Sequence, residues 1–111
     1  MTTSTVIDTL ADLVRINSVN SSYEGGTGER EIATSIRRYF ERQGIEVWEQ
    51  DVFPGAGRPN IIARLPGRDP TRRIILEAHT DTVGVQGMTI PPFEPRIAEG
   101  KLFGRGACDT K

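Results

Sequence analysis

The sequence predicts an α/β fold with an incomplete layer of elements. Two segments with helical spacing of apolar residues come first, and three strand-like segments follow them. The period of the pattern changes near residue 45, which separates the two kinds of element. No helix-like segment follows residue 80, so the last part of these 111 residues lacks an element to pack against.

A first helix is expected from Ser4 to Arg15. Thr3 or Ser4 can cap its N-terminus, and Asp8 suits the positive end of the helix dipole. Apolar residues recur on one face of this segment at helical spacing, namely Val6, Ile7, Leu10, Leu13 and Val14. This pattern is typical of a helix that covers a core with one side.

A second helix is expected from about Glu29 to Gln43, after the polar, glycine-rich loop of residues 17–28. Glu29 and Glu31 lie in its first turn, and Gly44 fits the left-handed position just past its end. Its buried face should consist of apolar and aromatic residues, namely Ile32, Ile36, Tyr39 and Phe40.

Three strands are expected next. Residues 45–53 alternate in polarity, and residues 60–65 follow a short loop rich in glycine and proline, so these two should form an antiparallel hairpin. Residues 72–80 contain three consecutive apolar residues, Ile74 to Leu76. Such a run indicates a third strand buried on both faces, as in the middle of an α/β sheet.

The C-terminal part has a different composition. Residues 83–95 hold two glycines and three prolines, which predicts a long irregular loop. Residues 96–98 and 101–103 should then form a small hairpin that turns at Glu99 and Gly100.

Composition excludes several classes of function. Charged residues make up 26% of the chain and the net charge is −1, so neither nucleic acid nor an anionic membrane is an expected partner. No apolar run approaches the ~20 residues of a membrane span, and the N-terminus lacks the basic start of a signal peptide. The single cysteine is compatible with a reducing compartment, so a cytoplasmic location is expected.

The only histidine, His79, is the first candidate for chemistry. In a strand, Glu77, His79 and Asp81 would share one face. Imidazole is the commonest neutral metal ligand, and a carboxylate such as Asp81 can fix its tautomer. From these residues alone, a hydrogen-bonded structural histidine or a partly exposed one is the more common case. Glu77 could accept a hydrogen bond from His79, but it is expected simply to be exposed at a sheet edge.

Asp109 is the second candidate. It follows small residues, Gly104, Gly106 and Ala107, which allow close backbone approach. A carboxylate in such a turn can bridge two cations, although by itself such an aspartate is more often an ordinary surface residue. Cys108 could be a thiolate ligand, but without a spaced partner it is expected to be a small buried side chain.

The order of the motifs is more specific than each motif alone. "RRIILEAHTDTV" followed by "PPFEPRIAEGKLFGRGACDTK" resembles the zinc-dependent amidohydrolase and exopeptidase family of acetylornithine deacetylase, succinyl-diaminopimelate desuccinylase, aminoacylase and carboxypeptidase G. Members of that family carry an apolar strand that ends in H-x-D-x-V, a proline-rich loop, a short hairpin ending in G-R-G, and an aspartate two residues before a lysine. Residues 74–111 carry all of these features.

The resemblance implies a three-layer α/β/α domain with a mixed sheet and two zinc ions, for which cobalt or manganese could substitute. His79 matches a terminal ligand of one zinc ion, and Asp109 matches the carboxylate that bridges both. Asp81 matches the catalytic aspartate that orients the histidine and tunes the site.

The implied reaction is hydrolysis of an amide bond in a small N-acyl amino acid or a small peptide by a metal-activated water. In the family, the general base, the remaining ligands and a smaller domain that often forms a homodimer all come after the matched aspartate. Residues 1–111 are therefore expected to be the N-terminal part of the catalytic domain and to be inactive alone.

Two other readings stay open. One is a non-catalytic relative that keeps the fold as a binding module, although the intact His79, Asp81 and Asp109 argue against it. The other is a stable small domain complete in 111 residues, against which the unpaired C-terminal segment argues.

Overall fold

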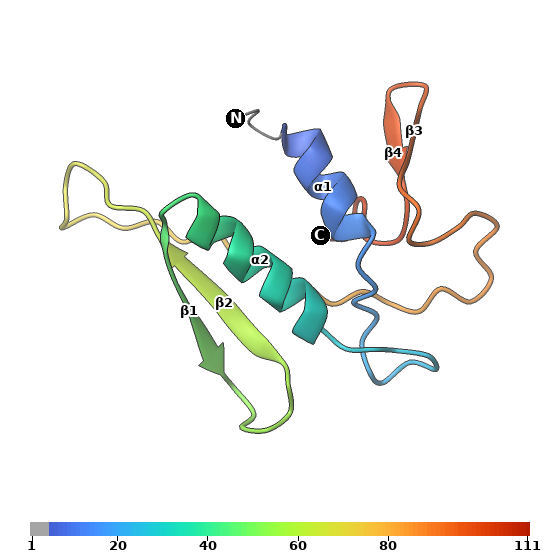
Figure 1. The fold of residues 1–111 in the computed structure, drawn as a ribbon, viewed down its shortest axis with the longest axis horizontal. Coiled ribbons are helices and arrows are strands. Elements are labelled where there is room, and N and C mark those ends of the chain that lie inside the picture. The colour runs from blue at the N-terminus through green and yellow to red at the C-terminus, as the bar shows by residue number, and fades with distance from the viewer. Residues whose placement is uncertain (1–4) are drawn as a thin grey trace.

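The computed structural model describes residues 5–111, which form two helices and two antiparallel two-stranded sheets. The elements in chain order are α1 (Val6–Val14), α2 (Arg30–Arg42), β1 (Glu46–Asp51), β2 (Pro59–Arg64), β3 (Arg96–Ala98) and β4 (Lys101–Phe103). Figure 1 shows α2 lying along the β1–β2 hairpin, while α1 lies toward the β3–β4 hairpin. The α/β class is confirmed in this coarse form.

The cap of α1 is Thr5 rather than the predicted Thr3 or Ser4, both of which lie outside the described residues. The Thr5 hydroxyl accepts a hydrogen bond from the Asp8 N–H at 3.1 Å, and the Asp8 carboxylate accepts one from the Thr5 N–H at 3.1 Å. These reciprocal bonds form a capping box. The Thr5 hydroxyl also donates to the Asp8 carboxylate at 2.8 Å, and this bond, followed by the one from the Thr5 N–H, holds the pKa of the Asp8 carboxyl below its ordinary value.

The second helix agrees with the prediction to within one residue at each end. Ile32 and Ala33 are fully buried, and Gly44 follows with a φ of +70°. Glu29 lies just before the helix, where its buried carboxylate accepts two hydrogen bonds from Arg58, at 2.9 and 3.0 Å. This ion pair links the start of α2 to the segment that leads into β2.

The predicted first hairpin is confirmed. Strands β1 and β2 are antiparallel, with Glu46 opposite Arg64 and Asp51 opposite Pro59. One face of the hairpin is covered by α2, so the two elements form a small helix-on-sheet layer.

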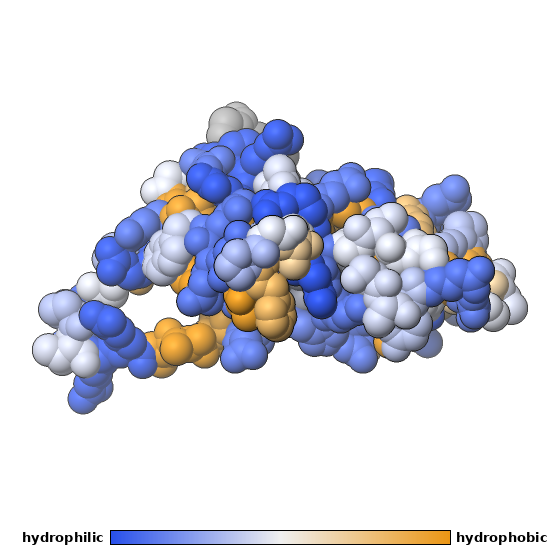
Figure 2. Space-filling view, turned by 90° about the horizontal axis from the view of Figure 1, so that it is seen from below, coloured by the Kyte–Doolittle hydropathy of each residue, from blue (hydrophilic) through white to orange (hydrophobic). Residues whose placement is uncertain are grey.

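The predicted third strand is wrong in this structure. Residues 72–80 form no strand, and Ile74, Ile75 and Leu76 are 89%, 87% and 91% exposed. A strand needs a neighbour for its backbone N–H and C=O groups, and within residues 5–111 no strand pairs with this segment. Figure 2 shows hydrophobic residues exposed at the surface among hydrophilic ones.

The predicted second hairpin is confirmed with its predicted bounds. Strand β3 pairs antiparallel with β4. The two turn residues, Glu99 and Gly100, have φ values of +53° and +71°, as the two-residue turn of a twisted hairpin requires.

Buried apolar residues come from both helices and from the segment that joins them, namely Ala11, Val14, Val19, Ile32 and Ala33. Gly104, which follows β4, lies directly against Val14, and a side-chain carbon on this glycine would collide with that valine. This close approach fixes the C-terminal turn against α1. Among the residues described, neither helix is long and apolar enough to cross a bilayer.

Candidate metal-binding site

The backbone that carries His79 and Asp81 is held by the segment after α1. The Ser18 hydroxyl donates to the Thr80 carbonyl at 2.7 Å. The Thr82 N–H donates to the Ser18 carbonyl at 3.0 Å, and the Asn20 N–H donates to the Thr82 carbonyl at 2.9 Å. Val19 and Thr82 form a parallel bridge, and both are 2% exposed. The local geometry is therefore fixed although the expected strand is absent.

His79 lies between two carboxylates. Its Nδ1 is 2.9 Å from the Asp81 backbone oxygen and 3.1 Å from Asp81 Oδ1. Its Nε2 is 3.1 Å from Asp109 Oδ1. The structure thus brings together the three residues that the sequence singled out, from two segments separated by a long loop.

The surroundings of the imidazole favour a positive charge. The backbone oxygen of Asp81, followed by the Asp109 carboxylate, raises the pKa of His79 above its ordinary value. A neutral imidazole has one N–H and one lone pair. If the proton stays on Nδ1, where Asp81 accepts it, the Nε2 lone pair faces an anionic oxygen of Asp109. A cation between these two atoms, either a proton or a metal ion, relieves that repulsion.

Asp81 is itself held in place by Asn20. The Asn20 side-chain amide donates to Asp81 Oδ2 at 3.0 Å, which leaves Oδ1 for His79. This hydrogen bond is the main reason that the pKa of Asp81 lies below its ordinary value. Asp81 therefore remains an anionic acceptor beside the imidazole.

Asp109 projects from a tight C-terminal turn, and its side chain is 88% exposed. Within this turn Gly106 has a φ of +86°, and a Cβ there would lie 2.6 Å from Lys111 Cγ. The Lys111 ammonium donates to the Ile16 carbonyl and lies 5.4 Å from the centre of the Phe93 ring. Burial lowers the pKa of Lys111 to about 8. The lysine thus anchors the turn, while the aspartate points toward His79.

The two other candidate residues, Cys108 and Glu77, both lie at the surface. Cys108 is exposed, so the expectation of a small buried side chain is wrong, because the turn directs it outward. Glu77 is exposed, and His79 contacts Asp81 instead. Among residues 5–111, no group of three or more histidine, cysteine, aspartate or glutamate side chains converges as it would around a metal ion.

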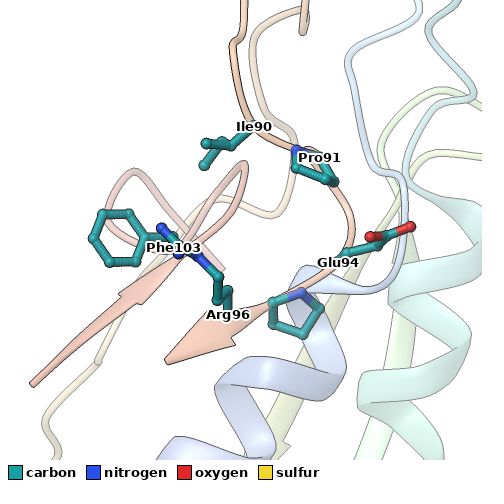
Figure 3. Close-up of a pocket in the computed structure, with 6 residues that line it drawn as sticks. Ile90, Pro91, Glu94, Arg96 and Phe103 are labelled. Carbon is teal, nitrogen blue, oxygen red and sulfur yellow. The ribbon is translucent and has the colours of Figure 1, made fainter. Parts of the chain in front are cut away.

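A shallow hollow of about 280 Å³ lies beside the β3–β4 hairpin. Figure 3 shows Arg96 next to Phe103 on one side and the Glu94 carboxylate directed away from them. The Arg96 guanidinium lies 5.1 Å from the centre of the Phe103 ring. The hollow does not include His79 or Asp109, so it is separate from the candidate site.

Sequence reasoning missed Ser18 and Asn20. Both lie in "NSVNSS", whose short polar residues are typical of turns. Nothing in their spacing connects them to Asp81, which is 61 residues away from Asn20 along the chain. Only the folded structure shows that this loop supports the histidine.

Comparison with known proteins gives matches across the chain. Residues 75–111 match the family described as Peptidase family M20/M25/M40. Over 90% of its own length, the chain is 40% identical to an uncharacterised metallohydrolase of Methanocaldococcus jannaschii. It is 38% identical to a succinyl-diaminopimelate desuccinylase of Gluconacetobacter diazotrophicus over 97% of its length. It is 35% identical to a putative LysW-lysine/LysW-ornithine hydrolase of Pyrococcus furiosus over its whole length.

These matches cover 27%, 27% and 28% of the three relatives, so the chain spans just over a quarter of their length. No solved structure matches the chain.

Proposed function

Because this chain belongs to peptidase family M20/M25/M40, we propose that His79 and Asp109 supply two ligands to the divalent metal site of an amide hydrolase. The observation that carries the proposal is the 3.1 Å separation between His79 Nε2 and Asp109 Oδ1. Asp81 has the third role, which is to orient the imidazole through Nδ1.

The side chains of His79 and Asp109 are of the kinds that bind zinc. An imidazole nitrogen and a carboxylate oxygen are both common zinc ligands, each about 2.0–2.2 Å from the ion. Two such atoms on one tetrahedral ion lie roughly 3–3.5 Å apart, which compares with the 3.1 Å between His79 Nε2 and Asp109 Oδ1. The carboxylate on Nδ1 is the usual partner of a histidine that ligates a metal.

The residues of this chain prepare the site in two ways. Asp81 accepts the proton of Nδ1, so that the Nε2 lone pair is directed toward Asp109. Asp109 offers an exposed carboxylate that a second cation can share. When bound, paired divalent ions acidify a water nucleophile and polarise the scissile carbonyl. Two protein ligands are fewer than a catalytic zinc site uses, so this chain alone should bind zinc weakly.

For the whole protein we propose removal of an acyl group from a small N-acyl amino acid, or cleavage of a small peptide. Support comes from relatives named succinyl-diaminopimelate desuccinylase and LysW-lysine hydrolase. The proposal includes two zinc ions, a three-layer α/β/α catalytic domain to which residues 1–111 contribute, and a cytoplasmic location. The exposed run Ile74 to Leu76 supports the larger domain, because its side chains would need cover.

Zinc binding to this chain tests the ligand assignment. Calorimetric titration should give weak binding that is lost in His79→Gln and in Asp109→Asn. Asp69→Asn is the matched control, since Asp69 is a surface carboxylate whose contacts are to Thr71 and Arg72. Equal affinities in all four proteins would contradict the assignment.

Hydrolysis by the whole protein tests the reaction. A panel of N-acyl amino acids and dipeptides should be cleaved, and a chelator should abolish cleavage until zinc or cobalt is restored. Cleavage that is insensitive to the chelator would contradict a metal-dependent mechanism, while zinc binding without cleavage would favour a binding module.

A further inference from the structure

We infer that Asn20 is a positioning residue for this site: its side-chain amide fixes the Asp81 carboxylate, and Asp81 in turn fixes the His79 tautomer. The inference rests on the proposed function, because a tautomer matters most where Nε2 ligates a metal. The chain of contacts runs from Asn20 Nδ2 to Asp81 Oδ2 at 3.0 Å, and from Asp81 Oδ1 to His79 Nδ1 at 3.1 Å.

Asn20 is held from both ends of its side chain. Its Oδ1 accepts the Ser22 N–H at 2.9 Å, so the other end of the amide is the donor that faces Asp81. Its backbone N–H donates to Thr82, and its carbonyl accepts from Tyr23 at 3.0 Å. With four groups engaged, the residue has little freedom to turn its amide away from Asp81.

The loop that carries Asn20 is closely packed. A side-chain carbon on Gly26 would collide with the Asn20 carbonyl, so the loop can close only around a glycine there. The Gly28 N–H donates to the Val19 carbonyl at 3.0 Å and ties the end of the loop to its start. Asn20 therefore approaches Asp81 from a rigid support rather than from a free surface loop.

Asn20 determines which Asp81 oxygen serves the imidazole. Because Oδ2 accepts from Asn20, Oδ1 is left to accept from His79. The carboxylate is only partly buried, with a side chain 35% exposed, so without Asn20 it can rotate toward water. The imidazole would then keep only the Asp81 backbone oxygen, 2.9 Å from Nδ1, as an acceptor for that proton, and Nε2 would carry the proton more often.

Two substitutions separate this role from the turn that Asn20 also makes. Asn20→Asp keeps an oxygen for the Ser22 N–H but replaces the donor by an anionic oxygen near Asp81. Asn20→Ser also keeps an oxygen for the turn, adds no charge and is too short to reach Asp81. Asn17→Asp is the matched control, because Asn17 Oδ1 accepts the Val19 N–H at 3.0 Å in the same segment.

The imidazole tautomer is the direct readout, and it does not depend on metal or activity. With one histidine in the chain, ¹⁵N NMR of the ring is free of overlap. Spectra are taken about two pH units above the midpoint of each variant, where the ring is neutral. The original chain and Asn17→Asp should show mainly the proton on Nδ1. Both Asn20 variants should shift toward Nε2. An unchanged tautomer in both Asn20 variants would overturn the inference.

Zinc affinity is the second readout. Loss of a residue that supports a ligand typically weakens metal binding about 10–100-fold, so both Asn20 variants should show a drop of about 10-fold or more, and Asn17→Asp should not. If the original chain fails to bind zinc, the assignment of His79 and Asp109 as zinc ligands fails, while the tautomer result still decides the role of Asn20. A tautomer shift with unchanged zinc affinity would overturn the link between Asn20 and the metal.

Discussion

Two neighbouring stretches of the same segment behave in opposite ways. Residues 72–78 contain the most apolar run in this part of the chain, yet Ile74, Ile75 and Leu76 are almost fully exposed and their backbone pairs with no strand among residues 5–111. Residues 79–82 are more polar, yet their backbone is hydrogen-bonded. Ser18 bonds to the Thr80 carbonyl and to the Thr82 N–H, and the Asn20 N–H bonds to the Thr82 carbonyl.

The difference shows that hydrophobicity alone does not place a strand. An apolar run gains from burial only when another surface covers it, which would contribute about 1.5–3 kcal/mol per large side chain. The polar stretch finds its partners within the first 20 residues of the chain, through side-chain and backbone hydrogen bonds. The candidate metal ligand is therefore set in place independently of the strand that leads to it.

Hydrogen exchange should separate the two stretches by the largest margin. The amides of Asn20 and Thr82 donate to buried backbone carbonyls, whereas residues 73–78 are exposed. Exchange of the first pair should be slower by about a hundredfold or more, measured residue by residue with NMR. Equal rates would mean that the support of residues 79–82 is not stable in solution.

Truncation of one apolar residue in residues 72–78, and of one that supports residues 79–82, should give the next largest contrast. Val19→Ala removes two methyl groups from a side chain that is fully buried, and should lower the free energy of unfolding by about 2 kcal/mol. Ile75→Ala, at 87% exposure, should change it by less than about 0.5 kcal/mol. Urea denaturation followed by circular dichroism measures both, and a larger loss for Ile75→Ala would reverse the comparison.

The pH dependence of His79 should give the smallest effect. Because its pKa is raised in the folded chain, the stabilisation is fully present below about pH 6.5 and is lost as the pH rises through the folded value. NMR titration of the ring should give a midpoint above that of a free histidine. Asp109→Asn should lower the midpoint, and the control Asp69→Asn should leave it unchanged. A midpoint at or below 6.5 in the original chain would contradict the arrangement of the two carboxylates.

Local signals made much of the fold predictable. The ends of α2 depend on residues close to it, such as Glu31 and Gly44, and the β3–β4 hairpin depends on Glu99 and Gly100 at its turn. The predicted start of α1 differs by a residue or two, because four consecutive hydroxyl residues can each cap a helix and only Thr5 is followed by an acid at the right spacing, Asp8.

Contacts between distant segments could not be predicted in the same way. Residues 72–80 are predicted as a buried strand because their apolar pattern indicates that the segment requires cover on both faces. The pattern does not show whether a partner strand is present. Asn20 and Asp81 carry no pattern that connects them, and the outward direction of Cys108 follows from a turn that depends on Gly106 and Lys111. The candidate residues His79, Asp81 and Asp109 came from motif order, which does not depend on such contacts.

The most direct test of the metal site is to find which nitrogen of His79 a metal ion takes. Zinc is titrated into the ¹⁵N-labelled chain while the two ring nitrogens are followed by NMR. The geometry predicts that Nε2, which faces Asp109 Oδ1 at 3.1 Å, changes its shift while Nδ1 keeps its proton beside Asp81. A change at Nδ1 instead, or no change at either nitrogen at millimolar zinc, would contradict it.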